Sequence, residues 1–162
     1  MSTVSAIIPV YNPLQHLDKV LDSLAGQTEL PDELIVTDDG SEEDVLGALR
    51  ARRTRFPAPI TYVRQPRRAP RRARCRNNGI RLARGEYLLF CDQDILFPRG
   101  YVETFRRERT PRRFLVAYPI RLTEAQTARV TPELIRTSDF LSLLNPAQRR
   151  KVGSSYRKEW WT

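Results

Sequence analysis

The sequence predicts an α/β protein in which a mostly parallel sheet is flanked by helices and followed by a helical C-terminal segment. Short apolar runs rich in β-branched residues alternate with segments whose apolar residues recur at helical spacing. This alternation is typical of a parallel sheet covered by helices on both faces. The length of 162 residues suits one domain of this kind.

Each expected element follows from a local pattern. Five apolar runs are expected as strands: residues 4–10, 34–37, 60–63, 87–91 and 114–118. Helices are expected between them, around residues 14–24, 45–49, 71–84 and 99–109. Ser41 stands where the second helix needs an N-cap, and Gly85 where the third needs a C-cap. In that third helix, Ala73, Asn77 and Ile80 share the face that we expect to be buried.

After Pro119 the strand–helix rhythm ends. Short helices are expected to begin at the capping residues that follow it: Thr131, Ser138 or Asp139, and Asn145. The chain therefore divides into residues 1–118, which hold the alternating core, and residues 119–162, which are expected to be helical.

Charge is distributed unevenly along the chain, whose formal net charge is +9. Residues 1–44 contain ten acids and one lysine, whereas residues 50–84 contain thirteen arginines and no acid. Arginine pairs with phosphate oxygens through two-point contacts. The basic segment therefore indicates a phosphate-bearing partner such as a nucleotide, a nucleic acid or an anionic membrane. For most of these arginines a solvated surface is the simpler interpretation.

Composition excludes several classes of protein. Cys75 and Cys91 cannot form a disulfide framework and have no neighbours at zinc-site spacing. The one histidine, His16, excludes schemes that need two. No apolar run approaches the roughly 20 residues of a membrane span, and no basic stretch precedes the first apolar run as in a signal peptide. We therefore expect a soluble protein of a reducing compartment, most simply the cytoplasm.

Candidate site residues follow the expected strands. In open parallel sheets, ligands bind beyond the carboxyl ends of the strands. The polar residues at these ends are Tyr11 and Asn12 after the first strand, Asp38 and Asp39 after the second, and Asp92, Gln93 and Asp94 after the fourth. An aromatic residue, an amide and four carboxylates are thus expected to converge on one edge.

Asp92 and Asp94 form the sharpest motif. Residues two apart in an extended segment point the same way, so both carboxylates can face one metal ion or one sugar with Gln93 turned aside. Mg²⁺ and Mn²⁺ prefer carboxylate oxygens and are often shared with substrate phosphates. The alternative interpretation is a turn with helix-capping carboxylates. The position directly after an apolar strand favours the functional interpretation.

Two nearby stretches are open to both a structural and a functional interpretation. Asp38–Ser41 is typical of a turn with a helix cap, yet a carboxylate there could also accept a hydrogen bond from a base N–H or a ribose hydroxyl. Arg64–Arg76 is the densest basic stretch, and its arginines either pair with a diphosphate or lie in solvent. For the first four of them, exposure to solvent is the favoured interpretation. Asn77 is expected to bond the backbone of a neighbouring loop.

Several segments, in the right order, resemble the family 2 glycosyltransferases, which have the Rossmann-like GT-A fold. The segments are Ser5–Asn12 (SAIIPVYN), Leu24–Thr28 (LAGQT), Glu33–Ser41 (ELIVTDDGS), and Arg76–Asp94, which contains RNNGI, ARGEYLLF and DQD. The resemblance covers roughly residues 4–118. It implies a nucleotide-sugar-binding core over residues 1–118 and the helical start of an incomplete acceptor-side region over residues 119–162.

The resemblance also implies roles for individual residues. Pro9, Tyr11 and Asp39 match positions that hold the nucleotide base, usually uracil. Asp92 matches a position near the ribose and the metal, and Asp94 matches the carboxylate that coordinates Mn²⁺ or Mg²⁺. The whole expected nucleotide-sugar site is Pro9, Tyr11, Asn12, Asp38, Asp39, Arg76 and Asp92.

The implied reaction is inverting transfer of a sugar from a nucleotide-diphospho-sugar, with UDP the expected nucleotide, to a hydroxyl acceptor in glycan or polysaccharide synthesis. A carboxylate base takes the acceptor proton, but the family's later acidic motif is not found after Pro119, where Glu133 and Asp139 are typical of helix starts. The catalytic base therefore stays unassigned. Because the chain closes on Trp160 and Trp161, which ordinarily seek burial, a partial transferase is expected.

Three other functions are weighed against this one. A non-catalytic module would keep the nucleotide-sugar site and lack turnover. A nucleic-acid-binding protein would explain the basic charge, but the arginines lack interleaved aromatics, so no nucleic-acid partner is expected. A nucleotidyltransferase would show a glycine-rich loop after the first strand, and residues 11–14 are not one. Contact between the basic surface and the cytoplasmic face of a membrane stays open.

Overall fold

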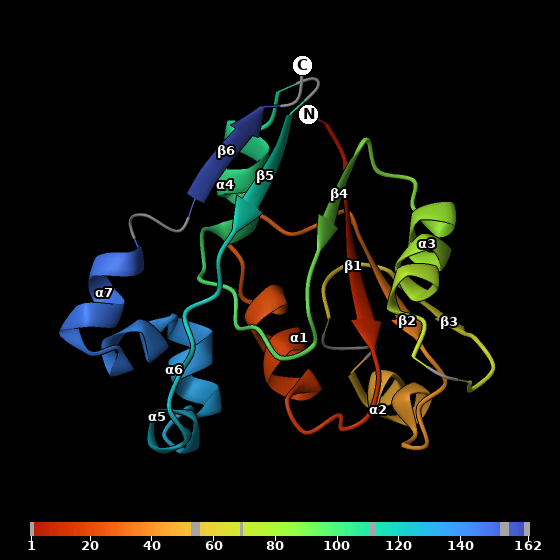
Figure 1. Cartoon of the computed structure of the whole chain (residues 1–162), viewed down its shortest axis with the longest axis horizontal. Coiled ribbons are helices and arrows are strands. Elements are labelled where there is room, and N and C mark those ends of the chain that lie inside the picture. The colour runs from red at the N-terminus through yellow and green to blue at the C-terminus, as the bar shows by residue number, and fades with distance from the viewer. Residues whose placement is uncertain (1, 53–55, 69, 111–112, 153–155, 161–162) are drawn as a thin grey trace.

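The computed structural model describes residues 2–52, 56–68, 70–110, 113–152 and 156–160 (Figure 1). A four-stranded sheet forms its centre, with the order β3-β2-β1-β4 and every neighbouring pair parallel. The strands are β1 (Val4–Val10), β2 (Glu33–Asp38), β3 (Ile60–Arg64) and β4 (Tyr87–Phe90). The predicted parallel α/β architecture is therefore confirmed, and each of these strands lies within one residue of its expected bounds.

Helices alternate with these strands and cover both faces of the sheet. They are α1 (Leu17–Ala25), α2 (Val45–Arg52), α3 (Arg72–Leu82) and α4 (Tyr101–Glu108). The even-numbered side chains of β1, such as Ile8 and Val10, share one core with Leu21 of α1 and Val102 of α4. Burial of this apolar surface supplies the main driving force for folding.

The opposite face of the sheet is covered by α3, and a glycine sets the distance between them. A Cβ placed on Gly79 would lie 2.5 Å from Cγ2 of Ile7 and 3.1 Å from Cγ2 of Thr37. Cys75, one turn earlier, is also buried, and its thiol donates a hydrogen bond to the Thr37 carbonyl at 3.0 Å. The glycine therefore lets α3 approach β1 and β2 closely.

The face of α3 that we expected to be buried is exposed. Ala73, Asn77 and Ile80 lie in solvent, with Ile80 42% exposed, whereas Cys75 and Gly79 face the sheet. The prediction that Asn77 bonds the backbone of a loop is also wrong: Asn77 makes no hydrogen bond within the described residues, and its neighbour Asn78 donates to the side-chain oxygen of Gln65 at 3.1 Å. The error arises because two small residues, rather than the larger apolar ones, make the buried contact.

Two predicted helix caps lie elsewhere in the structure. Helix α2 begins at Val45, and Asp44 rather than Ser41 caps it by accepting a hydrogen bond from the Gly47 N–H at 2.8 Å. Helix α3 ends at Leu82 with Ala83 as its C-cap. Gly85 serves another purpose, since a Cβ there would lie 2.6 Å from the backbone nitrogen of Ser5.

The C-terminal part is mostly helical, as predicted. Its helices are α5 (Glu124–Ala128), α6 (Pro132–Thr137), the 3₁₀ helix η1 (Asp139–Leu143) and α7 (Pro146–Val152), which lie on the β4 side of the sheet in Figure 1. Thr131 caps α6 as expected, accepting a hydrogen bond from the Leu134 N–H at 3.3 Å. Among the described residues, none of the helices is both long and apolar enough to cross a bilayer.

The fifth strand departs from the parallel arrangement. Strand β5 (Arg113–Ala117) exists, but it pairs antiparallel with β6 (Tyr156–Trp160) in a separate two-stranded sheet. A strand near the end of the chain was not expected, because residues 156–160 mix charged and aromatic residues without clear alternation. The expectation for Trp161 lies outside the described residues.

Candidate functional site

The carboxyl ends of β1, β2 and β4 bring the expected site residues to one edge of the sheet. The Asp39 N–H donates to the Val10 carbonyl at 3.0 Å, and the Cys91 N–H donates to the Ile7 carbonyl at 2.9 Å. The chain therefore leaves the sheet at neighbouring points after each of these strands. These contacts bring the residues that follow the three strands to the same edge of the sheet, where the sequence predicts that they converge.

Gln93 joins the loop after β1 to the turn after β4. Its side-chain oxygen accepts a hydrogen bond from the Tyr11 N–H at 2.8 Å, and its amide nitrogen donates to the Tyr11 carbonyl at 2.6 Å and the Pro13 carbonyl at 3.2 Å. Asn12, in the same loop, accepts a hydrogen bond from the Glu43 N–H at 3.3 Å. The backbone of residues 11–13 is thus fixed against the acidic turn.

The two carboxylates of the acidic motif differ in their partners. Asp92 pairs with Arg76 across 2.9 Å, and its side chain is 50% exposed. Asp94 is exposed and makes no hydrogen bond or ion pair with any residue that the structure describes. Residues 93–94 form a turn, with the Ile95 N–H 3.3 Å from the Asp92 carbonyl, rather than the extended segment that we expected.

Asp38 is fully engaged by neighbouring donors. Its side chain is 1% exposed, and one oxygen accepts the Gly40 and Ser41 N–H groups at 3.0 and 2.7 Å. The other oxygen accepts the Tyr62 hydroxyl at 2.7 Å and lies 3.4 Å from the Arg64 guanidinium. Burial, with the Asp38 hydrogen bond, raises the pKa of Tyr62 well above its usual range. The geometry of Asp38 favours the structural interpretation of this carboxylate.

Asp39 is also buried, and it organises the approach to α3. One of its oxygens accepts a hydrogen bond from the Gln65 amide, and the other accepts the Arg71 N–H at 2.7 Å. Gln65 in turn accepts a hydrogen bond from the Asn78 amide at 3.1 Å. The loop between β3 and α3 is therefore held against the predicted nucleotide edge.

Two glutamines of this edge, Gln65 and Gln93, were not identified from the sequence as site-building residues. A signal for Gln65 exists, since it directly follows β3 at the same edge where the other strands end. Gln93 was expected only to turn aside. Neither side chain is charged, so motif and charge arguments do not single them out.

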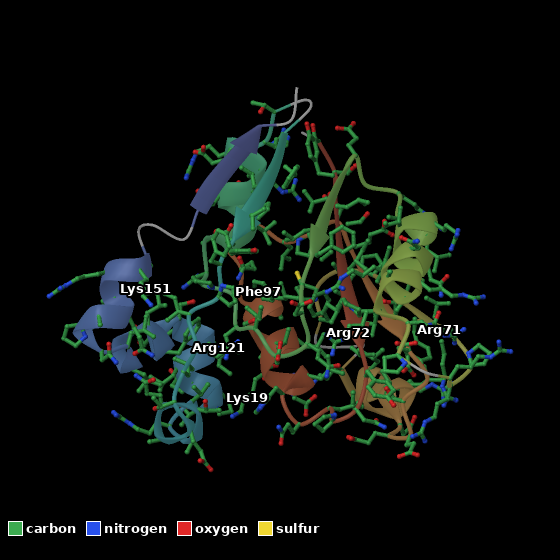
Figure 2. All side chains as sticks on the ribbon, in the orientation of Figure 1. Lys19, Arg71, Arg72, Phe97, Arg121 and Lys151 are labelled. Carbon is green, nitrogen blue, oxygen red and sulfur yellow. The ribbon has the colours of Figure 1, made fainter. Side chains whose placement is uncertain are left out.

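A cleft of about 730 Å³ opens beside the acidic turn. Asp92 and Asp94 contribute to its lining, and most of the rest is apolar and comes from the segment 95–101 and from residues 117–144. In Figure 2, Lys19, Phe97 and Arg121, which also line it, lie near one another on the left, whereas Arg71 and Arg72 lie further right, towards α3. The cleft thus joins a carboxylate pair to a largely apolar wall with a few cationic side chains.

The carboxylate pair fits a hard divalent cation in type but not as a complete cage. Among the described residues there is no group of three or more histidine, cysteine, aspartate or glutamate side chains arranged to hold a metal. Asp94 is free to ligate, and Asp92 is accessible beside Arg76. Such a donor set suits Mg²⁺ or Mn²⁺, which usually take one or two carboxylates together with substrate phosphates.

The fold and the carboxylate-bearing edge define an α/β protein of the GT-A type. The family model for Glycosyl transferase family 2 matches residues 5–140, and the chain belongs to this family. The chain is 38% identical over 103 residues to a validoxylamine A glucosyltransferase of Streptomyces hygroscopicus subsp. limoneus; the match covers 62% of this chain and 22% of that protein.

Solved structures give the same fold. The mannosyltransferase PcManGT of Pyrobaculum calidifontis, in complex with GDP-Man and Mn²⁺, superposes with a TM-score of 0.61 and 26% identity, over 74% of this chain and 36% of that one. TarS of S. aureus in complex with UDP superposes with a TM-score of 0.59 and 25% identity, over 65% of this chain and 31% of that one. The chain therefore spans only about a fifth to a third of the length of these three proteins.

Proposed function

We propose that the chain binds a nucleotide-diphospho-sugar, with UDP the preferred nucleotide, and takes part in inverting transfer of the sugar to a hydroxyl acceptor. The observation that carries the proposal is the Asp92–Asp94 turn, where an unpaired carboxylate lies beside an arginine-paired one at the mouth of the cleft. Membership of the family, and relatives whose names or titles give a glucosyltransferase and complexes with UDP or GDP-Man, support it.

Asp94 and Asp92 would hold a divalent metal, Mn²⁺ or Mg²⁺, shared with the diphosphate. When bound, this ion offsets the charge that grows on the leaving phosphate oxygens. Arg76 contributes a second positive charge beside the same carboxylate, since its guanidinium lies 2.9 Å from Asp92. The guanidinium can therefore exchange its carboxylate partner for a phosphate oxygen when the donor binds.

The nucleotide base is assigned to the opposite side of this edge. Tyr11, whose backbone Gln93 fixes, offers an aromatic ring, and Pro9 precedes it at the end of β1. Asp39 is buried, and the two hydrogen bonds that it accepts support the loop at residue 71. A contact with the base would be a second role of this carboxylate. Asp38 would act by holding the turn that Gly40 and Ser41 form.

A second candidate, a donor-binding module without turnover, is favoured by one observation. Asp92 and Asp94 are the only carboxylates that line the cleft within the described residues, and both are assigned to the metal. No further carboxylate there is positioned to take the proton of an acceptor hydroxyl. The chain also covers only 22% of the validoxylamine A glucosyltransferase that it resembles.

Release of UDP from UDP-sugars, measured beside donor binding, separates the two candidates. For an active transferase we expect Mn²⁺-dependent binding and a rate of UDP release that rises when alcohol-bearing acceptors are added. Binding without release would identify a donor-binding module. Failure to bind UDP-, GDP- and dTDP-sugars in the presence of either metal would overturn both.

A further inference from the structure

The outward surface of α3 is basic and includes one large exposed apolar side chain. We define the α3 surface as the exposed residues Arg72, Ala73, Arg74, Asn77, Ile80 and Arg81. None of them lines the cleft beside the acidic turn. This surface is therefore separate from the place where the proposed function puts the acceptor.

The charge of the α3 surface is not neutralised within the part of the chain that the structure describes. Arg72 and Arg74 have no ion-pair or hydrogen-bond partner among the described residues, and residues 50–84 contain no acid at all. Both lie in the first turn of α3, which holds no acidic residue. Cations at a helix N-terminus oppose the helix dipole. These arginines therefore do not stabilise their own helix, and a role toward an external anion explains their position better.

One large apolar side chain lies among these arginines. Ile80 is 42% exposed, and Ala73, two turns earlier on the same side of the helix, is exposed as well. Arg74 and Arg81 lie on one side of this line and Arg72 on the other, as the helical spacing requires. A helix face on which arginines flank an exposed isoleucine can lie at the interface of a lipid bilayer, with the guanidinium groups among the headgroups.

We propose that the α3 surface docks on an anionic lipid bilayer. The arginines would pair with lipid phosphates, and Ile80 would enter the boundary between headgroups and acyl chains. An anionic membrane fits better than a nucleic acid, because residues 64–84 contain no aromatic side chain on which a base could stack. Ile80 would also be placed against a charged sugar-phosphate backbone in a nucleic-acid complex.

Flotation with vesicles tests this proposal directly. The wild-type chain is expected to float with phosphatidylcholine vesicles that contain about one third phosphatidylglycerol, and not with pure phosphatidylcholine, and high salt should release it. The double variant Arg72→Glu/Arg74→Glu should bind these vesicles at least about tenfold more weakly than the wild type. Because acidic side chains stabilise the first turn of a helix, the variant should fold at least as well as the wild type.

A matched control changes the net charge equally on another part of the chain. Arg129 and Arg150 are exposed, lie in the C-terminal helical part, and form no ion pair with any residue that the structure describes. Arg129→Glu/Arg150→Glu should keep most of the vesicle binding, and Ile80→Ser should lose part of it without a change in salt dependence. Retention in the control together with loss in the α3 variant supports docking through this surface.

Three results would overturn the proposal. One is no flotation with anionic vesicles; another is an equal loss in both double variants, which would mean a response to net charge alone. The third is tighter binding to a single-stranded RNA oligonucleotide than to vesicles, which would reassign the α3 surface to nucleic acid. Binding of UDP, measured on the same samples, reports the proposed function separately, since the proposed donor site is built from Asp92, Asp94 and Arg76.

Discussion

Gln93 holds Tyr11 by both backbone groups, accepting from its N–H at 2.8 Å and donating to its carbonyl at 2.6 Å. The contact joins residues 82 positions apart. It makes the middle residue of the acidic motif a bridge between the turn proposed for the metal and the loop proposed for the base. The two halves of the proposed nucleotide site are thereby fixed relative to one another before a ligand arrives.

Replacing Gln93 should weaken nucleotide binding more than it weakens the fold. Gln93→Ala removes three hydrogen bonds to residues 11–13, and at about 1 kcal/mol each for the two shorter bonds we expect UDP binding to weaken by up to roughly thirtyfold. Gln93→Glu can still accept from the Tyr11 N–H but cannot donate to the carbonyls, so it should be no better. Titration calorimetry of UDP checks both variants.

Gln15 supplies the control for this experiment. It is exposed in the same loop region and makes no hydrogen bond within the described part of the chain. Gln15→Ala should bind UDP like the wild type. Equal affinities of the Gln93 and Gln15 variants would show that the bridge does not position the nucleotide.

Asp38 is expected to matter for stability. Asp38→Asn would turn an amide N–H₂ toward the Tyr62 hydroxyl or toward the Gly40 and Ser41 N–H groups in a site that is 1% exposed. The mismatch should cost about 2–4 kcal/mol of unfolding free energy. Urea unfolding measures this cost, and Asp139→Asn, an exposed control, should cost less than about 0.5 kcal/mol. A stable Asp38→Asn protein with lost nucleotide binding would instead assign Asp38 to the ligand.

Gly79 should tolerate no side chain. In Gly79→Ala the new Cβ would lie 2.5 Å from the Ile7 side chain, so α3 must move away from β1. We expect a loss of about 1–3 kcal/mol, as for other overpacked sites. In Gly100→Ala the nearest atom is 3.9 Å away, so that variant should retain its thermal midpoint. Equal midpoints for the two variants would contradict the close packing of α3.

Stability should fall at alkaline pH. Burial raises the pKa of the Cys75 and Cys91 thiols, and burial with the Asp38 hydrogen bond raises that of the Tyr62 hydroxyl. A group whose folded-state pKa is raised stabilises the fold fully below its unfolded pKa, and the effect is lost as pH rises through the folded value. In the unfolded chain, the pKa of cysteine is about 8.5 and that of tyrosine is about 10.

Urea midpoints should therefore stay level up to about pH 8 and decline steadily above it. The same burial should leave both thiols unreactive toward Ellman's reagent in the native protein at neutral pH. Cys91→Ala should flatten the decline even though it lowers the starting stability. A midpoint independent of pH between 8 and 10 would show that these groups are accessible to water in the native state.

The sequence was sufficient for the strands of the main sheet, because buried parallel strands are short apolar runs with sharp ends. It was insufficient for the face of α3, where Cys75 and Gly79 rather than Ile80 touch the sheet. Close packing through small residues leaves no hydrophobic signal. The pairing of β5 with β6 was not predicted either, because this antiparallel pairing depends on a segment about 40 residues away in the sequence.

For the candidate site, the sequence located the edge but not the role of each carboxylate. In the sequence, the pair Asp38 and Asp39 resembles the pair Asp92 and Asp94, because each follows an apolar strand. In the structure, the first pair is buried among hydrogen-bond donors and the second pair is exposed. Their difference comes from partners such as Tyr62, which lies on β3, and Gln65, which directly follows that strand. Only the assembled sheet separates a carboxylate that holds a turn from one that is free for a ligand.

The most direct test of the central proposal is calorimetric titration of UDP into the wild-type chain and into Asp94→Asn, with and without Mn²⁺, beside Asp139→Asn as the control. Since Asp94 makes no bond within the described residues, its variant should melt like the wild type. We predict binding that requires Mn²⁺, is at least about tenfold weaker in Asp94→Asn, as expected for the loss of a charged ligand, and is unchanged in the control. Equal Mn²⁺-dependent affinity in wild type and Asp94→Asn would contradict the assignment of the acidic turn as the metal and donor site.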